Sequence, residues 1–305
     1  TFAALAGRDL GFDRDRVLIV ELDAGPGHPA RAPLFERVRQ SVAALPGIAS
    51  TATSVIAPLS GAAWVTGLPD LGSEPGGSGA LVNAVSPGWF ATYGTRMLAG
   101  REFDGSDVAG GPAVAIVNQA FAREFLRGEN PIGRTLRLTR SSVEIVGLAT
   151  DAAYASVREP VQPTLYRPIA QSGSAPPTVV LSVRAVQGSP AALARSVASA
   201  IGAVDPSLAL TFRPLADAVD AMLGNERLLA TLSSFFAGLA LLLAALGLFG
   251  VTSYGVNRHR TEIAIRLALG ALPVRVLRLV LGRLALTVGI GIVLGVAASL
   301  AGMRF

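Results

Sequence analysis

A run of 30 residues, Leu228–Asn257, carries no charged side chain. As a helix rising about 1.5 Å per residue, this run reaches about 45 Å, which exceeds the ~30 Å hydrocarbon core of a bilayer. Arg227 and Arg258 bracket it, as expected when a charge at the bilayer centre costs about 2.5–3.5 kcal/mol. A second uncharged run, Leu284–Met303, is just long enough to span. The sequence therefore predicts two transmembrane helices, and the alternative is a pair of buried core helices in a soluble protein.

Charge is unevenly distributed along the chain. Residues 1–226 carry 18 arginines and 20 acidic residues, whereas residues 227–305 carry eight arginines and one acidic residue, Glu262. Six of these arginines lie between the two apolar runs: Arg258, Arg260, Arg266, Arg275, Arg278 and Arg283. Loops rich in arginine stay on the cytoplasmic side of a membrane. We therefore expect residues 1–226 to lie on the opposite side of the membrane, in the periplasm or outside.

The chain contains no lysine and no cysteine. Without lysine it has no P-loop ATPase site and no Schiff-base chemistry. Without cysteine it has no disulfide, thiolate nucleophile or cysteine-bound metal. The two histidines, His28 and His259, lie in unrelated contexts, and the basic charge lies between apolar runs, unlike a nucleic-acid-binding face. We therefore expect no catalytic residue, cofactor, metal or nucleic-acid partner.

Acidic residues cluster in the segment REFDGSD, which contains Glu102, Asp104 and Asp107. The spacing lacks the glycine and the terminal glutamate of an EF-hand loop, so we interpret it as a solvated turn. Asp151 follows a strand in VGLATD, where we expect it to cap the next segment. The glycine-rich tract 67–79 is expected to be a flexible loop.

Two strand–helix–strand patterns stand far apart in the sequence. Strands are expected at residues 16–22, 48–56, 178–185 and 208–213, and helices at 33–45 and 189–203, the second opened by Ser189 and Pro190. Two such units suggest a split, ferredoxin-like layer.

Residues 80–170 are expected to form an inserted α/β subdomain between these units. Its predicted elements are strands at 82–85, 114–117, 135–138 and 143–148, a short helix opened by Ser86-Pro87, and a helix at 119–126. The predicted fold class is therefore an α+β domain followed by transmembrane α-helices. Residues 1–14 are expected to be the exit of a preceding transmembrane helix.

The segment TEIAIRLALGA (261–271) resembles the REIGIRxALGA signature of FtsX-like permeases of the MacB type, membrane subunits of a class of ABC transporters. Further segments match the family in its order: GFDRDRVL (11–18), LPGI (45–48), VSPGWFATYGTRMLAGREF (85–103), AIVNQAFAREF (115–125), NPIGRTLRL (130–138), VEIVGLATD (143–151) and LGLFGVTSYGVNRHRTEIAIR (246–266). The greatest likeness is to duplicated permeases of this family without a fused ATPase.

The resemblance implies a multi-pass protein of the bacterial inner membrane with residues 15–226 in the periplasm. The periplasmic core would contain a porter-like subdomain, residues 15–66 and 176–226, with the inserted subdomain 80–170. Helices within 227–257 and 277–305 would be the second and third of a four-helix FtsX-like domain that is truncated here.

The resemblance also implies a function. A cytoplasmic ABC ATPase on a separate chain would hydrolyse ATP, and the permease, a non-catalytic subunit, would relay the movement to the periplasm (mechanotransmission) in efflux or export. The expected assembly is a homodimer or pseudo-dimer in membrane lipid, with a periplasmic adaptor or outer-membrane channel as a further partner. The alternative is a membrane-anchored sensor or scaffold that activates an envelope enzyme.

The segment 258–276 is predicted to be the coupling loop. Its candidate partner-binding residues are Arg258, Glu262, Ile263, Arg266, Leu267 and Gly270. The charged three stand four residues apart on one helical stripe, where the acid pairs with both arginines, and the other three form a neighbouring stripe. Such a helix can dock in a groove of a partner or anchor the loop at anionic headgroups. The residues leave both readings open, and the resemblance favours the coupling helix.

Overall fold

The computed structural model describes residues 10–25, 27, 31–62, 64–68, 79–138, 141–153, 160–173 and 176–258, together with Ile265, Gly291 and Gly295. The chain divides into two units, Thr1–Leu228 and Leu229–Phe305, and each is described by itself. All the strands given below belong to the first unit.

The two predicted strand–helix–strand units interleave in one antiparallel layer. Its strands lie in the order β11 (Ala209–Pro214), β1 (Val17–Asp23), β10 (Thr178–Ala185) and β2 (Ile48–Ser54). Helix α2 (Arg31–Ala43) links β1 to β2, and α5 (Ala194–Val204) precedes β11. Interleaved βαβ units of this kind form the split, ferredoxin-like arrangement, so the predicted α+β fold class is confirmed.

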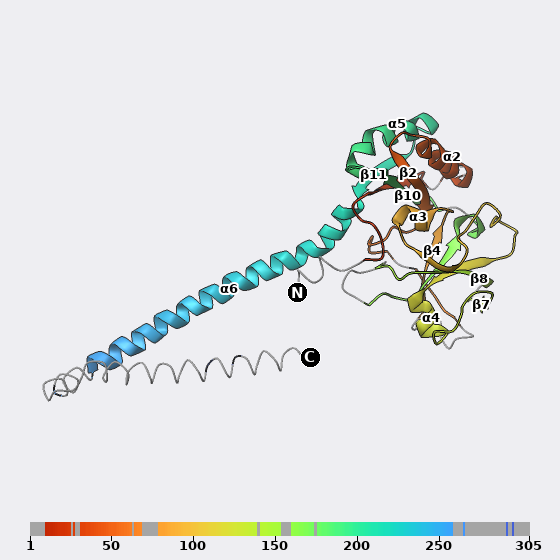
Figure 1. Cartoon of the computed structure of the whole chain (residues 1–305). Coiled ribbons are helices and arrows are strands. Elements are labelled where there is room, and N and C mark those ends of the chain that lie inside the picture. The colour runs from red at the N-terminus through yellow and green to blue at the C-terminus, as the bar shows by residue number, and fades with distance from the viewer. Residues whose placement is uncertain are drawn as a thin grey trace. The chain divides into compact units, whose positions relative to one another are not determined.

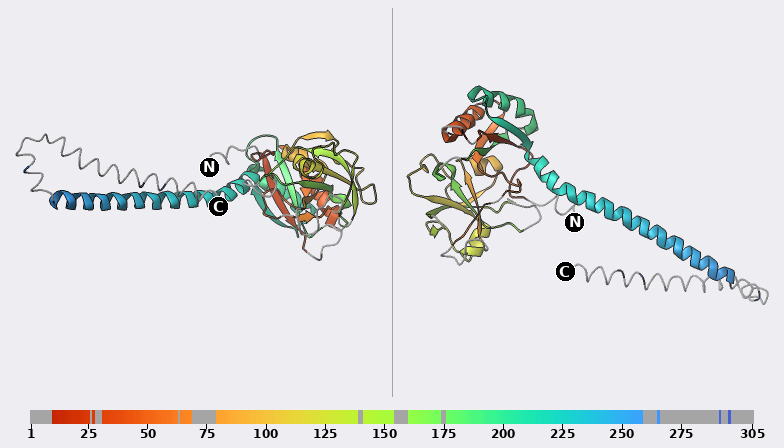
Figure 2. Two further views of the ribbon diagram at one scale, coloured as in Figure 1. Left: turned by 90° about the horizontal axis from the view of Figure 1, so that it is seen from below. Right: turned by 180° about the vertical axis from the view of Figure 1, so that it is seen from behind.

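The apolar pattern of β1 explains its central place. Leu18, Val20 and Leu22 lie in a core with α2 and α5, whereas Val17 and Ile19 belong to the core on the opposite face. A strand that is apolar on both sides is typical of a sheet covered on both faces. Helices α2 and α5 lie side by side over one face, as Figures 1 and 2 show.

The remaining strands extend the same sheet through the inserted segment. After β2 the order continues with β4 (Ala80–Val85), β9 (Thr164–Pro168), β6 (Val114–Asn118), β8 (Ser142–Ala149) and β5 (Met97–Gly100), while β3 (Trp64–Thr66) pairs with β4 and β7 (Thr135–Arg137) with β8. The helical elements here are α3 (Trp89–Tyr93), α4 (Gln119–Phe125) and the 3₁₀ turn η2 (Ile169–Gln171). Strands β3, β5 and β9 were not among the predicted elements.

The two halves of the sheet meet through a short junction. Strands β2 and β4 share a single bridge, Ser54 opposite Val85. Beside it the Ser86 amide donates to the Thr53 carbonyl (2.8 Å), and the Thr53 amide donates to the Ser86 hydroxyl (2.9 Å). A side-chain oxygen thus replaces a backbone acceptor where the ladder ends.

An aromatic cluster joins the inserted segment to the first layer. The rings of Trp89 and Tyr93 on α3 are 4.7 Å apart, and Trp89 lies 5.1 Å from Tyr166 of β9. The buried Tyr93 hydroxyl hydrogen-bonds the Ser182 hydroxyl of β10 at 2.7 Å. Burial raises the pKa of Tyr93 and outweighs that hydrogen bond, so the phenol stays neutral. Helix α3 of the inserted segment thus packs on β2 and β10 of the first layer. The predicted subdomain boundaries stay a prediction.

Two local expectations differ from the structure. Residues 10–14, predicted to belong to the exit of a membrane helix, are non-helical, and Leu10 is buried in the folded unit. Residues 1–9 lie outside the described residues. Pro190 opens a helical segment as predicted, but that segment is the 3₁₀ turn η3 (Pro190–Leu193), and the Ser189 side chain makes no capping hydrogen bond.

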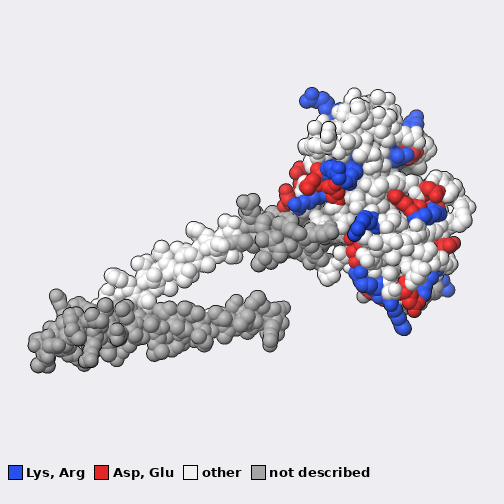
Figure 3. Space-filling model, in the orientation of Figure 1, with Lys and Arg blue, Asp and Glu red and all other residues white. Residues whose placement is uncertain are grey.

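Helix α6 (Leu215–Arg258) contains the first predicted span. Within it, Thr231–Val251 has a mean hydropathy of 2.3 and is long and apolar enough to cross a membrane. The described surface of this segment carries no charged side chain, whereas basic and acidic side chains are scattered over the first unit (Figure 3). Among the described residues this is the one such helix. The second predicted span, Leu284–Met303, lies outside the described residues except for Gly291 and Gly295, which are helical.

Replacing Gly100 by alanine should destabilise the folded domain. Its φ is +73°, and an added Cβ would lie 2.1 Å from the Val146 carbonyl oxygen, so both strain and overlap oppose the change. We expect Gly100→Ala to lower the free energy of unfolding by about 2–4 kcal/mol. Chemical denaturation of the protein measures it.

The matched control is Gly105→Ala. An added Cβ there meets nothing within 4 Å, so its effect should stay within about 0.5 kcal/mol. Equal effects of the two substitutions would contradict the packing described at Gly100.

Candidate functional site

The predicted coupling residues fall almost entirely outside the described part of the chain. Arg258 is the last residue of α6. The other five, Glu262, Ile263, Arg266, Leu267 and Gly270, lie outside the described residues. The coupling segment therefore stays a prediction.

The acidic cluster of the inserted segment is a structural network. The Arg101 guanidinium donates to both Asp107 carboxylate oxygens, at 2.7 and 2.8 Å, and Asp107 is 6% exposed. The hydrogen bonds from Arg101 hold the pKa of Asp107 below its usual value, against the effect of burial. The interpretation as a solvated turn is therefore wrong for Asp107, although Asp104 is exposed. Glu102 instead accepts the Phe90 amide of α3 at 3.3 Å, and burial raises its pKa.

The Asp151 side chain caps helix α4 of the inserted segment. Its carboxylate accepts the Ala120 amide at 2.7 Å and pairs with Arg123 at 2.7 Å, both on α4. The Asn118 side chain accepts the Phe121 amide at 2.9 Å. Two side chains thus satisfy the first turn of α4, which precedes Asp151 in the sequence. The expected cap of the segment after Asp151 stays a prediction, because residues 154–159 lie outside the described residues.

The segment that leads into β1 is held by a partly buried ion pair that sequence reasoning missed. Asp13 accepts from Arg184 of β10 at 2.6 Å and from Arg16 at 3.0 Å, while Arg184 also donates to the Thr92 carbonyl. Burial raises the pKa of Asp13, but the Arg16 hydrogen bond and the Arg184 charge outweigh it, so the pKa lies below its usual value. The pair ties the N-terminal segment to β10 and α3.

An unusual turn follows β2. The Ser60 amide donates to the Ala57 carbonyl at 3.3 Å, which places Pro58 and Leu59 at the centre of the turn. Leu59 has φ +59°, a left-handed conformation that turns usually assign to glycine or asparagine. This costs about 1–2 kcal/mol for a residue with a Cβ. Burial of the leucine side chain, 3% exposed, contributes about 1.5–3 kcal/mol and offsets the strain.

The Leu59 side chain packs where several chain segments converge. Its cluster contains Leu10 of the N-terminal segment, Ala153 after β8, and Val219 in the part of α6 that belongs to the first unit. The Ala153 amide donates to the Leu10 carbonyl at 2.8 Å. The segments that continue in sequence towards residues 1–9 and towards the apolar span thus share one small apolar cluster.

A cavity of about 300 Å³ lies beside this turn. The turn residues 55–60 with Ala62, the sheet face of β1, β10 and β11, and Ala218 of α6 line it. Its lining is apolar from Ile19 and Val180 and polar from Glu21 and Arg213.

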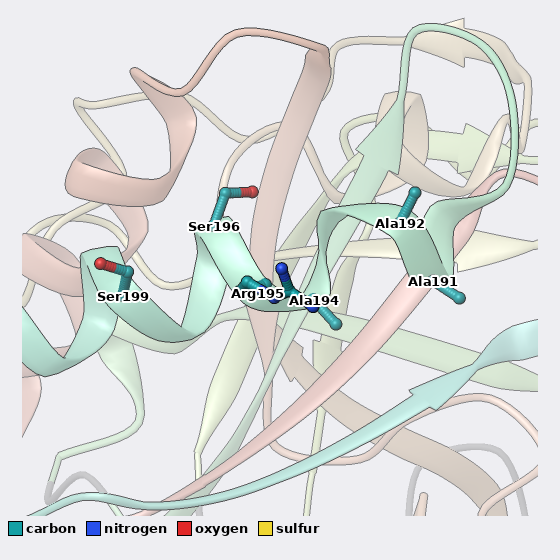
Figure 4. A pocket seen from close by; sticks show the side chains of 6 residues that line it. All are labelled: Ala191, Ala192, Ala194, Arg195, Ser196 and Ser199. Atoms are coloured by element: carbon teal, nitrogen blue, oxygen red, sulfur yellow. The ribbon is translucent and has the colours of Figure 1, made fainter.

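A second, open surface lies over α5 and η3 (Figure 4). Its lining residues are Ala191, Ala192, Ala194, Arg195, Ser196 and Ser199. Short side chains and one guanidinium supply no group of catalytic or metal-binding geometry here. Among the residues that the structure describes, no group of three or more His, Cys, Asp or Glu side chains is placed to hold a metal.

Comparison with known proteins decides the family. Residues 4–204, more than half of the chain, match the MacB-like periplasmic core domain. The chain belongs to this family. Residues 234–305 match the FtsX-like permease C-terminal domain, in the expected order along the chain. It is a MacB/FtsX-type ABC permease, and members of this family are inner-membrane proteins with a periplasmic domain that work with cytoplasmic ATPase partners.

Among solved structures, 21 chains match this chain. The periplasmic region of MacB from Actinobacillus actinomycetemcomitans is 12% identical with a TM-score of 0.49, over 73% of this chain and 98% of that one. The extracellular domain of the ABC-type transporter YknZ from Gram-positive bacteria is 12% identical with a TM-score of 0.43, over 64% and 99%. A domain of a putative permease from Porphyromonas gingivalis is 16% identical with a TM-score of 0.41, over 67% and 92%. The comparison with curated proteins gives no match.

Replacing Asp13 by asparagine should destabilise the MacB-like domain in a pH-dependent way. At pH 7 the change leaves Arg184, whose side chain is 14% exposed, without its carboxylate, and we expect a loss of about 1–3 kcal/mol in unfolding free energy. A carboxyl with a lowered folded pKa stabilises above its unfolded pKa, and this contribution disappears as the pH falls through the folded value. The difference between parent and variant should therefore shrink below about pH 4. Denaturant titrations from pH 7 to pH 3 measure it.

Asp15→Asn is the control for charge. The Asp15 side chain is 78% exposed, and its nearest guanidinium, that of Arg14, is 3.6 Å away, so we expect less than about 0.5 kcal/mol. A pH-independent loss in Asp13→Asn would contradict the ion-pair account.

Proposed function

We propose that this chain is the permease subunit of a MacB/FtsX-type ABC system that relays ATP-driven movement from a cytoplasmic ATPase, carried on a separate chain, to its periplasmic domain in efflux or export. The observation that carries the proposal is the order of the two matched domains, residues 4–204 and 234–305. The apolar segment Thr231–Val251 overlaps the start of the second match. The chain itself has no lysine for a P-loop.

The predicted contact with the ATPase supports a specific mechanism. In a helix, Arg258, Glu262 and Arg266 would lie on one stripe, and Glu262 and Arg266 would lie with Gly270 at the contact with the ATPase. The neighbouring stripe that contains Ile263 and Leu267 would enter a groove of the ATPase. Movement of that helix would pass along the membrane helices to the periplasmic domain.

The direct test is purification of the intact membrane protein followed by an ATPase assay on what purifies with it. A P-loop ATPase with hydrolysis above background supports the proposal. If no ATPase accompanies the protein under conditions that retain the membrane complex, the sensor or scaffold function is favoured instead.

Replacing both Glu262 and Arg266 by glutamine should weaken the contact with the ATPase. Truncation at the centre of an interface commonly costs about 2 kcal/mol, which corresponds to about thirtyfold in affinity. We expect the double variant to reach the membrane normally but to lose ATPase copurification and periplasmic response. Arg275→Gln with Arg278→Gln is the control, because it lowers the loop's positive charge outside the predicted stripes. Equal losses in both double variants would indicate a general charge effect and contradict the assignment.

Topology can be tested with single cysteines, because the chain contains none. In spheroplasts, a membrane-impermeant maleimide should label Glu21→Cys, a position exposed on the folded domain. Ala268→Cys, in the predicted cytoplasmic loop, should be labelled only after permeabilisation. Labelling of Ala268→Cys from outside would show that the topology is the reverse of the predicted one.

A further inference from the structure

The turn after β2 has a strained residue at a position that selection could have filled with glycine. Leu59 adopts φ +59°, whereas Gly61, two residues later, also has positive φ without a side-chain penalty. A leucine in this conformation persists only where its surroundings keep it there. Here the surroundings are Leu10, Ala153 and Val219, three apolar side chains from separate segments.

The loop begins at a firm anchor. The Ile56 amide donates to the buried Asn83 side chain at 3.1 Å, and the Asn83 amide group donates back to the Ile56 carbonyl at 2.9 Å. Beyond the turn, Ser60, Gly61 and Ala62 are exposed. The loop 57–62 therefore has a fixed hinge at Ile56 and a solvent-exposed second half, before the chain pairs again with β4 at β3.

There is also space beside the loop for a second position. The cavity of about 300 Å³ is lined by the loop itself, by the sheet face and by Ala218 of α6. If Val219 moved away, Leu59 would lose the burial that compensates its backbone strain. The loop would then relax to a right-handed or extended conformation, for which the adjacent cavity supplies room. A strained segment with two available positions is the kind of element that couples separate sites.

We propose that residues 57–62 form a strap that is closed while Leu59 contacts Val219 and opens when α6 moves relative to the N-terminal segment. The inference rests on the proposed function, because α6 continues in sequence into the apolar span through which ATP-driven movement would reach the domain. In the closed position Leu59 holds the N-terminal segment and α6 together. Opening exposes the cavity and the apolar cluster, so the strap converts movement of α6 into a change at the domain surface.

The test uses the reactivity of a thiol placed at Val219→Cys, in membranes that contain the full protein and its ATPase. Without ATP, the buried position should react slowly with a water-soluble maleimide. Adding Leu59→Ala should raise the labelling rate about tenfold, because the side chain that covers the position is lost. Ala52→Cys, fully buried in β2 outside the cluster, is the control and should stay slow in both backgrounds. If Leu59→Ala lowers the yield of folded protein, Leu59→Gly, which relieves the strain, replaces it.

ATP distinguishes this proposal from the proposed function. In the parent, ATP should accelerate labelling at Val219→Cys, and the acceleration should disappear in Leu59→Ala. If ATP has no effect while Leu59→Ala still accelerates labelling, the strap stands and the proposed relay fails. If ATP accelerates labelling equally with and without the leucine, the relay stands and the strap is overturned. The strap is also overturned if Leu59→Ala leaves the rate unchanged, or if Ala52→Cys accelerates to the same extent.

Discussion

The folded domain depends on the aromatic contacts that α3 makes with both halves of its sheet. The direct ladder between the halves is a single bridge from β2 to β4, too little to fix two sub-sheets against each other. Trp89 and Tyr93 supply the missing contact, because they pack against Tyr166 on one side and reach Ser182 on the other. Buried aromatic pairs contribute about 0.5–1.5 kcal/mol each beyond the area they bury. The junction is therefore held by side-chain packing more than by backbone hydrogen bonds.

Polar contacts around this core act mainly as positioning devices. The Asp13–Arg184 pair and the Asp151 cap each join segments that lie far apart in sequence, and in each case a carboxylate meets either a guanidinium or a helix N-terminus. Removing a charge from water costs free energy that one pair barely recovers. Their value is geometric, because they fix where the N-terminal segment and α4 enter the fold. A similar balance holds at Leu59. Burial of its apolar side chain offsets the strain of the left-handed backbone, so the net free energy is small.

The sequence predicts those elements whose signals are local. The run VLIVELD marks β1, spacing at Leu34, Val38 and Val42 marks α2, and the uncharged stretch marks the span in α6. Strands β5 and β9 escape prediction because they are only four and five residues long and are defined by distant partners. No local pattern indicates that Asp13 pairs with Arg184, 171 positions later. Pro58 is typical of a turn, but nothing in the sequence indicates that Leu59 adopts the left-handed conformation. The predicted coupling residues depend on resemblance and lie beyond the described residues.

The pairing of β1 with β10 sets an order of assembly. Val17 lies opposite Arg184 and Leu18 opposite Pro214, so β1 meets its neighbours only after nearly the whole domain has been synthesised. Until then Leu18, Val20 and Leu22 lack the sheet that will cover them. Contacts of such high sequence separation form late and slowly. A chain that emerges N-terminus first must therefore complete its central strand last, and the apolar side chains of β1 stay uncovered until then.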